Sequence, residues 1–252
     1  MPTNATGSPV QVAVMGIPIA PVRMGEAAAW VAAWVQSRAG KTVFTVNPEI
    51  TMLAGRDDEF AAILRASDLN LADGVGVVLA ARLAGLEIPE RVAGADFAEH
   101  LGEVGGALGW SIFFLGGREG VARRAGEALA RRHPGLRIAG WSEADSGEAA
   151  DEETVAAINA VNTDLLLVAF GAPGQERWIA RNLKSLDVGV AIGVGGTFDF
   201  LAGDIPRAPA RMRAVGLEWL YRLINQPSRW RRMLALPAFA AAALRWALGS
   251  RR

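Results

Sequence analysis

The chain has 252 residues, of which 51% are hydrophobic and 21% charged, so it can bury a substantial core and is not intrinsically disordered. It contains no cysteine and two histidines, which excludes disulfides, thiolate catalysis, cysteine-ligated zinc and a histidine-rich metal site. The formal net charge is zero, which argues against general nucleic-acid binding.

Short apolar runs alternate with amphipathic segments, which predicts an α/β fold: a Rossmann-like, mostly parallel sheet with helices on both faces. Strands are expected at 11–15, 42–46, 69–72, 111–115, 136–140, 165–170 and 188–194. Helices are expected at 24–38, 57–66, 75–84, 95–108, 119–132, 151–161, 175–182 and 211–224. The continuous apolar run at 165–170 is typical of a strand that is covered on both faces.

The charge is distributed unevenly along the chain. Residues 205–252 contain ten arginines and a single acid, Glu218, which gives this segment a charge of +9 and the remainder −9. Pro206 and Pro209 mark the change, and they predict a Rossmann-like core at 1–204 and an Arg-rich appendage at 205–252. Such a segment on an acidic body indicates a partner that carries phosphates or carboxylates. A solvated helix face combined with biased composition is the alternative.

The appendage is also expected to meet a membrane without crossing it. Its longest apolar run, 233–244, is 12 residues long and contains Pro237, whereas a span needs about 18. Arginines beside Trp219, Trp230 and Trp246 and a short apolar helix are typical of a segment that lies on an anionic bilayer. The first basic residue is Arg23, so the sequence lacks the charged start of a signal peptide, and the chain is expected in the cytoplasm, at the inner face of the cell membrane. The alternative is that 233–244 packs on the body, or on a second subunit of a homo-oligomer.

Ligands of open α/β sheets bind outside the carboxyl ends of the strands, so the turns that follow the predicted strands are where a site is expected. These turns carry polar side chains and pairs of glycines: Thr45, Asn47, Asp73, Gln175, Gly116, Gly117, Gly195 and Gly196. The Gly116–Gly117 turn leads into a predicted helix, whose free N–H groups could hold a phosphate.

Each of the polar residues has a structural interpretation beside the functional one. Asp73 could accept a proton from a substrate hydroxyl, or it could cap the helix that begins at Val75. Asn47 and Gln175 suit sugar hydroxyls or a uracil edge, and they equally suit hydrogen bonds that cap loops. Arg91, ahead of a predicted helix, could neutralise a phosphate or form a surface ion pair.

Three further arginines, Arg222, Arg229 and Arg232, flank a break in the appendage at 225–227. Guanidinium groups gathered in this way suit a diphosphate, and a solvated face is again the alternative.

Standard nucleotide and metal motifs are missing from the sequence. The run 193–198 lacks the third glycine of the dinucleotide fingerprint, and Gly40-Lys41-Thr42 lacks the first glycine of a P-loop. There is no Asp-x-Asp pair, by which many sugar-nucleotide transferases hold a divalent metal, and no Gly-x-Ser-x-Gly. We therefore expect neither a metal ion nor a resident cofactor.

In combination, the motifs resemble those of the WecG/TagA/CpsF family, glycosyltransferase family 26. The matching stretches are TVNPEI (45–50), LADGVGVV (71–78), RVAGADF (91–97), FFLGG (113–117), LLLVAFGAPGQERWIA (165–180), GVGGTFDFLAG (193–203), RAP (207–209), GLEWLYRL (216–223) and PSRWRR (227–232). Their order and spacing cover about residues 10–235, which is nearly the whole chain.

This resemblance implies a function that spacing alone does not give. Family members transfer a sugar from a UDP-sugar to a polyprenyl-diphosphate-linked saccharide at the cytoplasmic face of the membrane, with inversion at the anomeric carbon. By position, the family's proposed base falls on Asp73. The polar residues of its pocket fall on Thr45, Asn47, Arg91 and Gln175, and the arginines of its appendage on Arg222, Arg229 and Arg232.

The expected function is thus an inverting glycosyltransferase of cell-surface or exopolysaccharide synthesis, with an N-acetylmannosamine-type or a glucose- or glucuronate-type donor. Two alternatives stay open. One is a nucleotide-sugar-binding partner in an assembly that has lost catalysis. The other is an NAD-dependent sugar dehydrogenase, against which the incomplete fingerprint counts.

Overall fold

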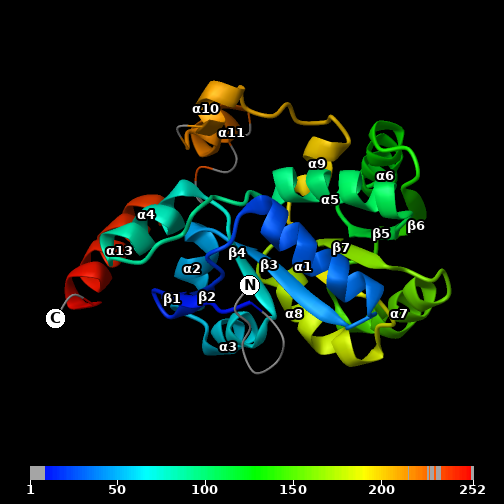
Figure 1. The fold of residues 1–252 in the computed structure, drawn as a ribbon, viewed down its shortest axis with the longest axis horizontal. Coiled ribbons are helices and arrows are strands. Elements are labelled where there is room, and N and C mark those ends of the chain that lie inside the picture. The colour runs from blue at the N-terminus through cyan, green and yellow to red at the C-terminus, as the bar shows by residue number, and fades with distance from the viewer. Residues whose placement is uncertain (1–8, 215, 226, 228–229, 231–233, 251–252) are drawn as a thin grey trace.

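The structure is a computed structural model that describes residues 9–214, 216–225, 227, 230 and 234–250. At its centre is a six-stranded sheet of order β4-β3-β8-β7-β5-β6, in which all neighbouring strands are parallel (Figure 1). Its strands are β3 (Lys41–Val46), β4 (Leu69–Ala72), β5 (Ser111–Gly116), β6 (Arg137–Ser142), β7 (Leu165–Ala169) and β8 (Val190–Gly193). The predicted parallel α/β fold is confirmed.

Helices cover both faces of this sheet (Figure 1). One face carries α1 (Met24–Gln36), α5 (Gly94–Leu108), α6 (Val121–Arg132) and α9 (Thr197–Leu201). The other carries α2 (Pro48–Ala54), α3 (Asp58–Ala66), α4 (Val75–Leu83), α7 (Asp151–Asn159) and α8 (Gly174–Asn182), with the short helices η1 (Glu148–Ala150) and η2 (Leu183–Ser185) beside them. The strands other than the edge strand β6 are buried on both sides, and Leu165, Leu166, Leu167 and Val168 of β7 have no exposed surface.

The first predicted strand, at 11–15, lies outside the main sheet. β1 (Val12–Val14) pairs antiparallel with β2 (Ile17–Ile19) in a separate hairpin. Met15 and Gly16, which connect them, both have positive φ angles, as a two-residue turn between antiparallel strands requires. The sequence prediction missed β2, because Pro18 at its centre indicated an interruption rather than a strand in a two-stranded edge.

Three helical segments also differ from the prediction. α2 begins directly after β3, where Asn47 caps it and Pro48 takes its first position, and it was not predicted. The short helix α9 was also missed. The helix expected at 211–224 is divided into α10 (Ala210–Ala214) and α11 (Glu218–Asn225), and between them Gly216 has a φ of +75°. A left-handed residue cannot continue an α-helix, which accounts for the division.

The last helix, α13 (Ala235–Ser250), packs on the body of the protein beside α2 and α4 (Figure 1). Phe239, Ala243 and Ala247, spaced by four residues, form its buried face. Gly76 of α4 makes room for this contact, since a Cβ there would lie 3.3 Å from the Phe239 ring. The alternative expected for 233–244, packing on the body, therefore holds for one face of this helix, while residue 233 lies outside the described residues.

None of the helices in the described part of the chain is both long and apolar enough to cross a bilayer.

Candidate functional site

The carboxyl ends of β3 and β4 meet the start of α5 at the carboxyl edge of the sheet. Thr45 is the fifth residue of β3, and Asp73 comes directly after β4. A Cβ placed on Gly94, the first residue of α5, would lie 3.2 Å from Thr45 Oγ1 and 3.6 Å from Asp73 Oδ2. A hydroxyl group, a carboxyl group and the backbone of a buried glycine thus converge from three elements.

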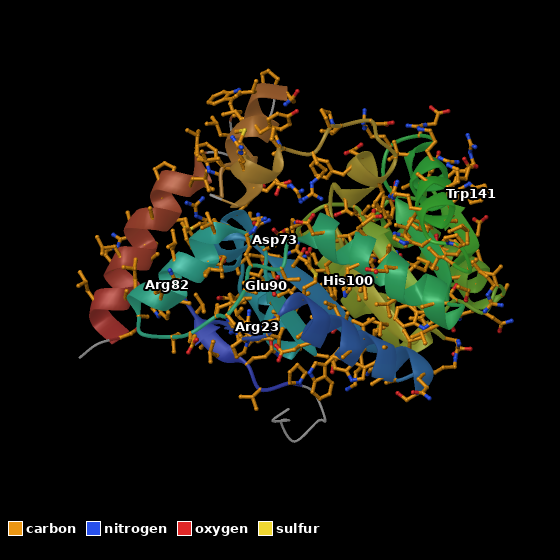
Figure 2. All side chains as sticks on the ribbon, turned by 45° about the horizontal axis from the view of Figure 1, so that its top comes forward. Arg23, Asp73, Arg82, Glu90, His100 and Trp141 are labelled. Carbon is orange, nitrogen blue, oxygen red and sulfur yellow. The ribbon has the colours of Figure 1, made fainter. Side chains whose placement is uncertain are left out.

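Backbone hydrogen bonds hold this arrangement beyond the ends of the strands. The Asp73 N–H donates to Val46 O at 2.8 Å, and the Val92 N–H donates to Ala72 O at 2.9 Å. The second bond brings the segment ahead of α5, including Arg91, alongside the end of β4. Figure 2 shows Asp73 on the side of the core that carries α10 and α11.

The alternative in which Asp73 caps α4 is wrong. Gly74 occupies the N-cap position, with a φ of +120°, a conformation that side chains larger than hydrogen rarely adopt. Asp73 therefore precedes the cap, at the end of the strand. Gly216 of the appendage packs close by, since a Cβ on it would lie 2.6 Å from the side chain of Val75.

After two neighbouring strands, the chain leaves this edge toward opposite faces of the sheet. After β3 the chain enters α2 on one face, and after the adjacent strand β8 it enters α9 on the other. Such a switch point is where open α/β sheets bind ligands. Thr45 lies at this switch point, because its Oγ1 donates a 3.4 Å hydrogen bond to Gly193 O of β8.

Asn47 and Gln175 both take part in loop-capping hydrogen bonds, the alternative that the sequence left open. Asn47 Oδ1 accepts from the Ile50 N–H at 3.0 Å and so caps α2. Gln175, 2% exposed, accepts through Oε1 from the Gly195 N–H at 2.8 Å and from the Gly171 N–H at 3.2 Å. Gln175 thereby ties the loop after β7 to the loop after β8. Gly196, the next residue, is the N-cap of α9.

The Gly116–Gly117 turn lies apart from this cluster. β8 and β7 separate β5 from β3, which corresponds to roughly 14 Å at the usual strand spacing. The N–H of Gly120, the N-cap of α6, donates to a carboxylate oxygen of Glu143. The N-terminus of α6, which follows the turn expected to hold a phosphate, therefore already binds the carboxylate of Glu143. Gly116 is needed for packing, since a Cβ there would lie 2.7 Å from the Phe170 ring.

Arg91 takes part in an ion-pair network that joins the core to the appendage. Its Nη1 lies 3.4 Å from Glu218 Oε2, and Glu218 Oε1 accepts from Arg207 Nε at 3.0 Å. Arg207 Nη2 and Arg213 Nη1 in turn lie 2.8 Å and 3.1 Å from Asp96 Oδ1. The ion pair expected as the alternative for Arg91 is present, with Arg91 22% and Glu218 18% exposed in their side chains.

The three arginines expected around the break at 225–227 are described only in part. Arg222 lies on α11, four residues after Glu218 in the same helix. Arg229 and Arg232 lie outside the described residues. The roles expected for these three arginines stay predictions.

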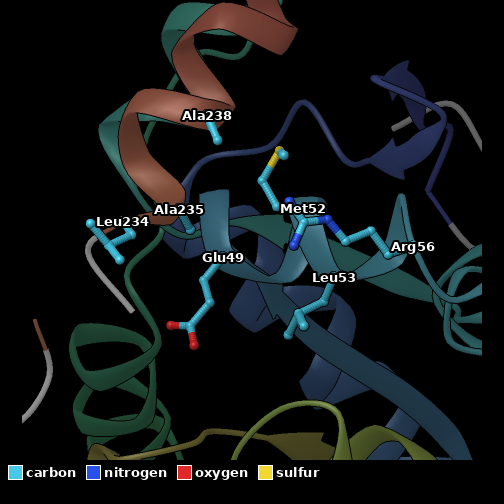
Figure 3. Close-up of a pocket in the computed structure, with 7 residues that line it drawn as sticks. All are labelled: Glu49, Met52, Leu53, Arg56, Leu234, Ala235 and Ala238. Carbon is cyan, nitrogen blue, oxygen red and sulfur yellow. The ribbon is translucent and has the colours of Figure 1, made fainter. Parts of the chain in front are cut away.

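A separate cavity of about 380 Å³ lies between α2 and α13 (Figure 3). Its lining is mostly apolar and consists of Met52, Leu53, Leu234, Ala235 and Ala238, together with Glu49 and Arg56. Because neither Thr45 nor Asp73 lines it, this cavity is distinct from the strand-end cluster.

Within the described ranges, no group of three or more His, Asp or Glu side chains is arranged to hold a metal ion. Two carboxyl groups near the site besides Asp73 form ion pairs: Asp199 pairs with Arg118 at 2.7 Å, and Asp96 with Arg207 and Arg213.

Sequence reasoning missed several residues of this region. Gly94 lies in one of the motifs that carry the family resemblance, but its importance comes from its approach to Thr45 and Asp73. Glu218 is the single acid of the basic segment 205–252, and this isolation in the sequence could have indicated an ion pair. Glu176, which is fully buried beside Gln175, gave no signal beyond its position in a motif.

The fold and the site define a Rossmann-like parallel α/β protein whose carboxyl group, hydroxyl group and glycine backbone meet at a topological switch point, where open α/β sheets bind ligands. The chain belongs to the glycosyl transferase WecG/TagA/CpsF family, whose sequence profile matches residues 12–252. The resemblance seen in the motifs is thereby confirmed.

Two relatives are similar over most of their length. The N-acetylglucosaminyldiphosphoundecaprenol N-acetyl-beta-D-mannosaminyltransferase of Bacillus subtilis (strain 168) is 36% identical over 213 residues, which cover 84% of this chain and 82% of the relative. The protein of the same name from Bacillus spizizenii (strain ATCC 23059 / NRRL B-14472 / W23) matches with the same identity and coverage.

Proposed function

We propose that this protein is an inverting glycosyltransferase that moves an N-acetylmannosamine-type sugar from a UDP-sugar to a polyprenyl-diphosphate-linked saccharide. The observation that carries the proposal is the convergence of Asp73, Thr45 and Gly94 at the strand ends. Family membership and the names of the two relatives support both the transfer reaction and the kind of acceptor.

In the proposed reaction, Asp73 acts as the general base. The acceptor hydroxyl oxygen forms a bond to the anomeric carbon of the donor, while the bond from that carbon to the UDP phosphate breaks on the opposite face. The hydroxyl proton passes to the Asp73 carboxylate, and the electron pair of the broken bond leaves with UDP. Thr45 lies within the same cluster and is suited to a hydrogen bond with a substrate hydroxyl.

Negative charge on the departing diphosphate has to be met by groups of the protein. Arg91 is one such group, because the segment that carries it runs beside the end of β4 and leads into α5. The fifteen-residue helix α5 begins at Gly94, and the positive end of its dipole adds to the favourable field. Arg222, Arg229 and Arg232 are proposed to contribute to the same task.

The identity of the sugar rests on the relatives. Both are named as N-acetylmannosaminyltransferases that act on an undecaprenol-linked N-acetylglucosamine, which favours this donor over a glucose- or glucuronate-type donor. At 36% identity a few pocket contacts can differ, and one substrate hydroxyl can decide specificity where the site hydrogen-bonds it.

We also propose that the protein works at the inner face of the cell membrane, where a polyprenyl-linked acceptor resides. α4 exposes Leu79 and Leu83, and α13 exposes Leu244 and Leu248. Each pair is spaced by four residues and so shares one helix face. Residues 235–250 include no acid, so no negative side chain of this helix opposes an anionic lipid surface.

A panel of UDP-sugars offered with a short-chain polyprenyl-diphosphate N-acetylglucosamine tests the proposal. We expect transfer from UDP-N-acetylmannosamine, with UDP as the second product. Donor binding without turnover would favour the assembly-partner alternative, and oxidation that depends on a nicotinamide cofactor would favour the dehydrogenase.

A further inference from the structure

One buried acid in the structure is not used by the proposed reaction. Glu176 lies in the first turn of α8 and has no exposed surface. Its Oε2 has no hydrogen-bond partner among the residues that the structure describes. Burying a carboxyl group lowers stability unless hydrogen bonds or ion pairs offset the loss of water, and one oxygen of Glu176 has neither.

The other oxygen of Glu176 makes one well-formed contact. Oε1 accepts a hydrogen bond of 2.8 Å from Nε2 of Gln175, the residue whose Oε1 accepts from the N–H groups of Gly171 and Gly195. The carboxyl group, the amide and the two backbone loops form one continuous chain of hydrogen bonds. The loops are those that follow β7 and β8, and β8 is also bonded to Thr45.

This chain of hydrogen bonds fixes the orientation of the Gln175 side-chain amide. If the amide were reversed, its NH₂ group would face the two backbone N–H donors, and its oxygen would face Glu176 Oε1. With the Glu176 carboxylate ionised, all three hydrogen bonds would then be lost, because donors would oppose donors and an acceptor would oppose an acceptor. The amide also rests directly on β8, where a Cβ at Gly193 would lie 2.9 Å from Nε2.

We propose that Glu176 is a positioning residue for the sugar transfer: by orienting the Gln175 amide, it holds the Gly171 and Gly195 loops in place at the strand ends. The inference rests on the proposed function, since it assigns these loops to the substrate site. Glu176 does not touch substrate itself, because its carboxyl group is buried beneath Gln175.

The positioning role requires a hydrogen-bond acceptor at position 176 rather than a charge. Variants that keep the acceptor can therefore be compared with variants that remove it. Glu176→Gln keeps the size and places an amide oxygen where Oε1 now accepts. Glu176→Met keeps an unbranched side chain of similar length and removes the acceptor. Glu176→Leu is a second apolar variant, should the methionine variant not fold. Asn182→Leu, on the same helix, removes a buried polar group that bonds to Trp178 O and serves as the control.

Two measurements are needed. The first is turnover with the donor and acceptor that the panel identifies. We expect Glu176→Met to lower kcat by about tenfold to a hundredfold and to change the donor KM by less than about threefold. A displacement of the substrate-site loops by about 1 Å can have an effect of this size. Glu176→Gln and Asn182→Leu are expected to keep kcat within about threefold. By NMR, the Gly195 and Gly171 amide protons of Glu176→Met are expected to exchange at least about tenfold faster than in the parent, relative to amides of β5.

The exchange measurement does not depend on any sugar transfer, so it separates this proposal from the proposed function. Faster Gly195 exchange in a protein without transferase activity would support the orienting role and overturn the assigned reaction. Unchanged exchange and unchanged kcat in a folded Glu176→Met or Glu176→Leu would overturn the positioning role. The positioning role would also be overturned if Glu176→Gln lost activity while the Gly171 and Gly195 amides stayed protected. The charge of Glu176, and not its ability to accept a hydrogen bond, would then be required for activity.

Discussion

Nη1 of Arg91 lies 3.4 Å from Oε2 of Glu218, so the segment ahead of α5 is joined to the first residue of α11. This contact spans 127 positions of sequence, and it brings the single acid of the basic appendage to the edge of the candidate site. Through Glu218 and Asp96, three arginines of the core and the appendage share two carboxylates.

Glu218→Ala is expected to loosen the appendage. Removing the carboxylate leaves Arg91 and Arg207 without this partner, which at their partial exposure should lower the free energy of unfolding by about 1 kcal/mol. Trypsin should then cleave after Arg207, Arg211 and Arg213 several times faster than in the parent, as followed by mass spectrometry. Glu153→Ala, at an exposed acid of α7, is the control. Equal cleavage rates in both variants would mean that the network does not hold the appendage.

Asp73→Asn is expected to lower kcat about 10²- to 10⁴-fold, because the amide retains the shape of the side chain but cannot take a proton. The fold should be unaffected, since Gly74 and not Asp73 is the N-cap of α4. Circular dichroism and thermal unfolding check the fold, and Asp58→Asn, at an exposed acid of α3, is the control. Full turnover by Asp73→Asn would eliminate Asp73 as the base.

Chelation is expected to leave most of the activity in place. The sequence has no Asp-x-Asp pair and no cysteine, so it lacks the usual first ligands of a divalent metal. The measurement is turnover after EDTA treatment and desalting, with and without added Mg²⁺ or Mn²⁺. Loss of activity that either ion restores would contradict the prediction, and Asp73 and Asp199 would then be the ligands to test.

Stability is expected to depend on pH through Glu176. Burial raises the pKa of this carboxyl from its ordinary value near 4.5 to about 7. The folded state therefore binds the proton more tightly than the unfolded state, and the stability present below pH 4.5 is lost as the pH rises toward 7. The parent should lose up to roughly 3 kcal/mol of unfolding free energy over this range through this one group.

Glu176→Gln cannot ionise, so it isolates this contribution. Urea unfolding of the parent and of Glu176→Gln at several pH values between 4.5 and 8 measures it. The variant should gain stability relative to the parent as the pH rises to about 7, and the difference should then level off. A difference that stays constant with pH would show that Glu176 ionises as easily when folded as when unfolded.

Binding to anionic vesicles is expected to depend on the exposed leucines of α13. Leu244→Ser combined with Leu248→Ser should reduce co-sedimentation with phosphatidylglycerol vesicles severalfold, because both side chains are more than half exposed and do not support the core. Leu108→Ser, at a leucine of α5 that is 60% exposed, is the matched control. If the double variant sediments like the parent, this face of α13 does not bind lipid.

Much of the architecture could be predicted from the sequence. Apolar runs such as 165–170 are continuous because helices cover both faces of the strand, and this local pattern is enough to indicate a parallel α/β sheet. The motifs were enough to indicate the family, and the position of Asp73 directly after an apolar run placed it correctly at a strand end. The hairpin of β1 and β2 was missed because Pro18 interrupts the apolar run of β2, and because its turn depends on positive φ angles at Met15 and Gly16, which only Gly16 signals by residue type.

What the sequence by itself determined were the properties set by neighbouring residues: the parallel sheet, the strand-end position of Asp73 and the uneven charge. Only the tertiary structure decided which strand ends meet. Gly94 approaches Thr45 and Asp73, and Gln175 bonds to Gly195, because the sheet order places β3 between β4 and β8. The order of strands follows from packing among residues far apart in the chain, and no local pattern carries that information.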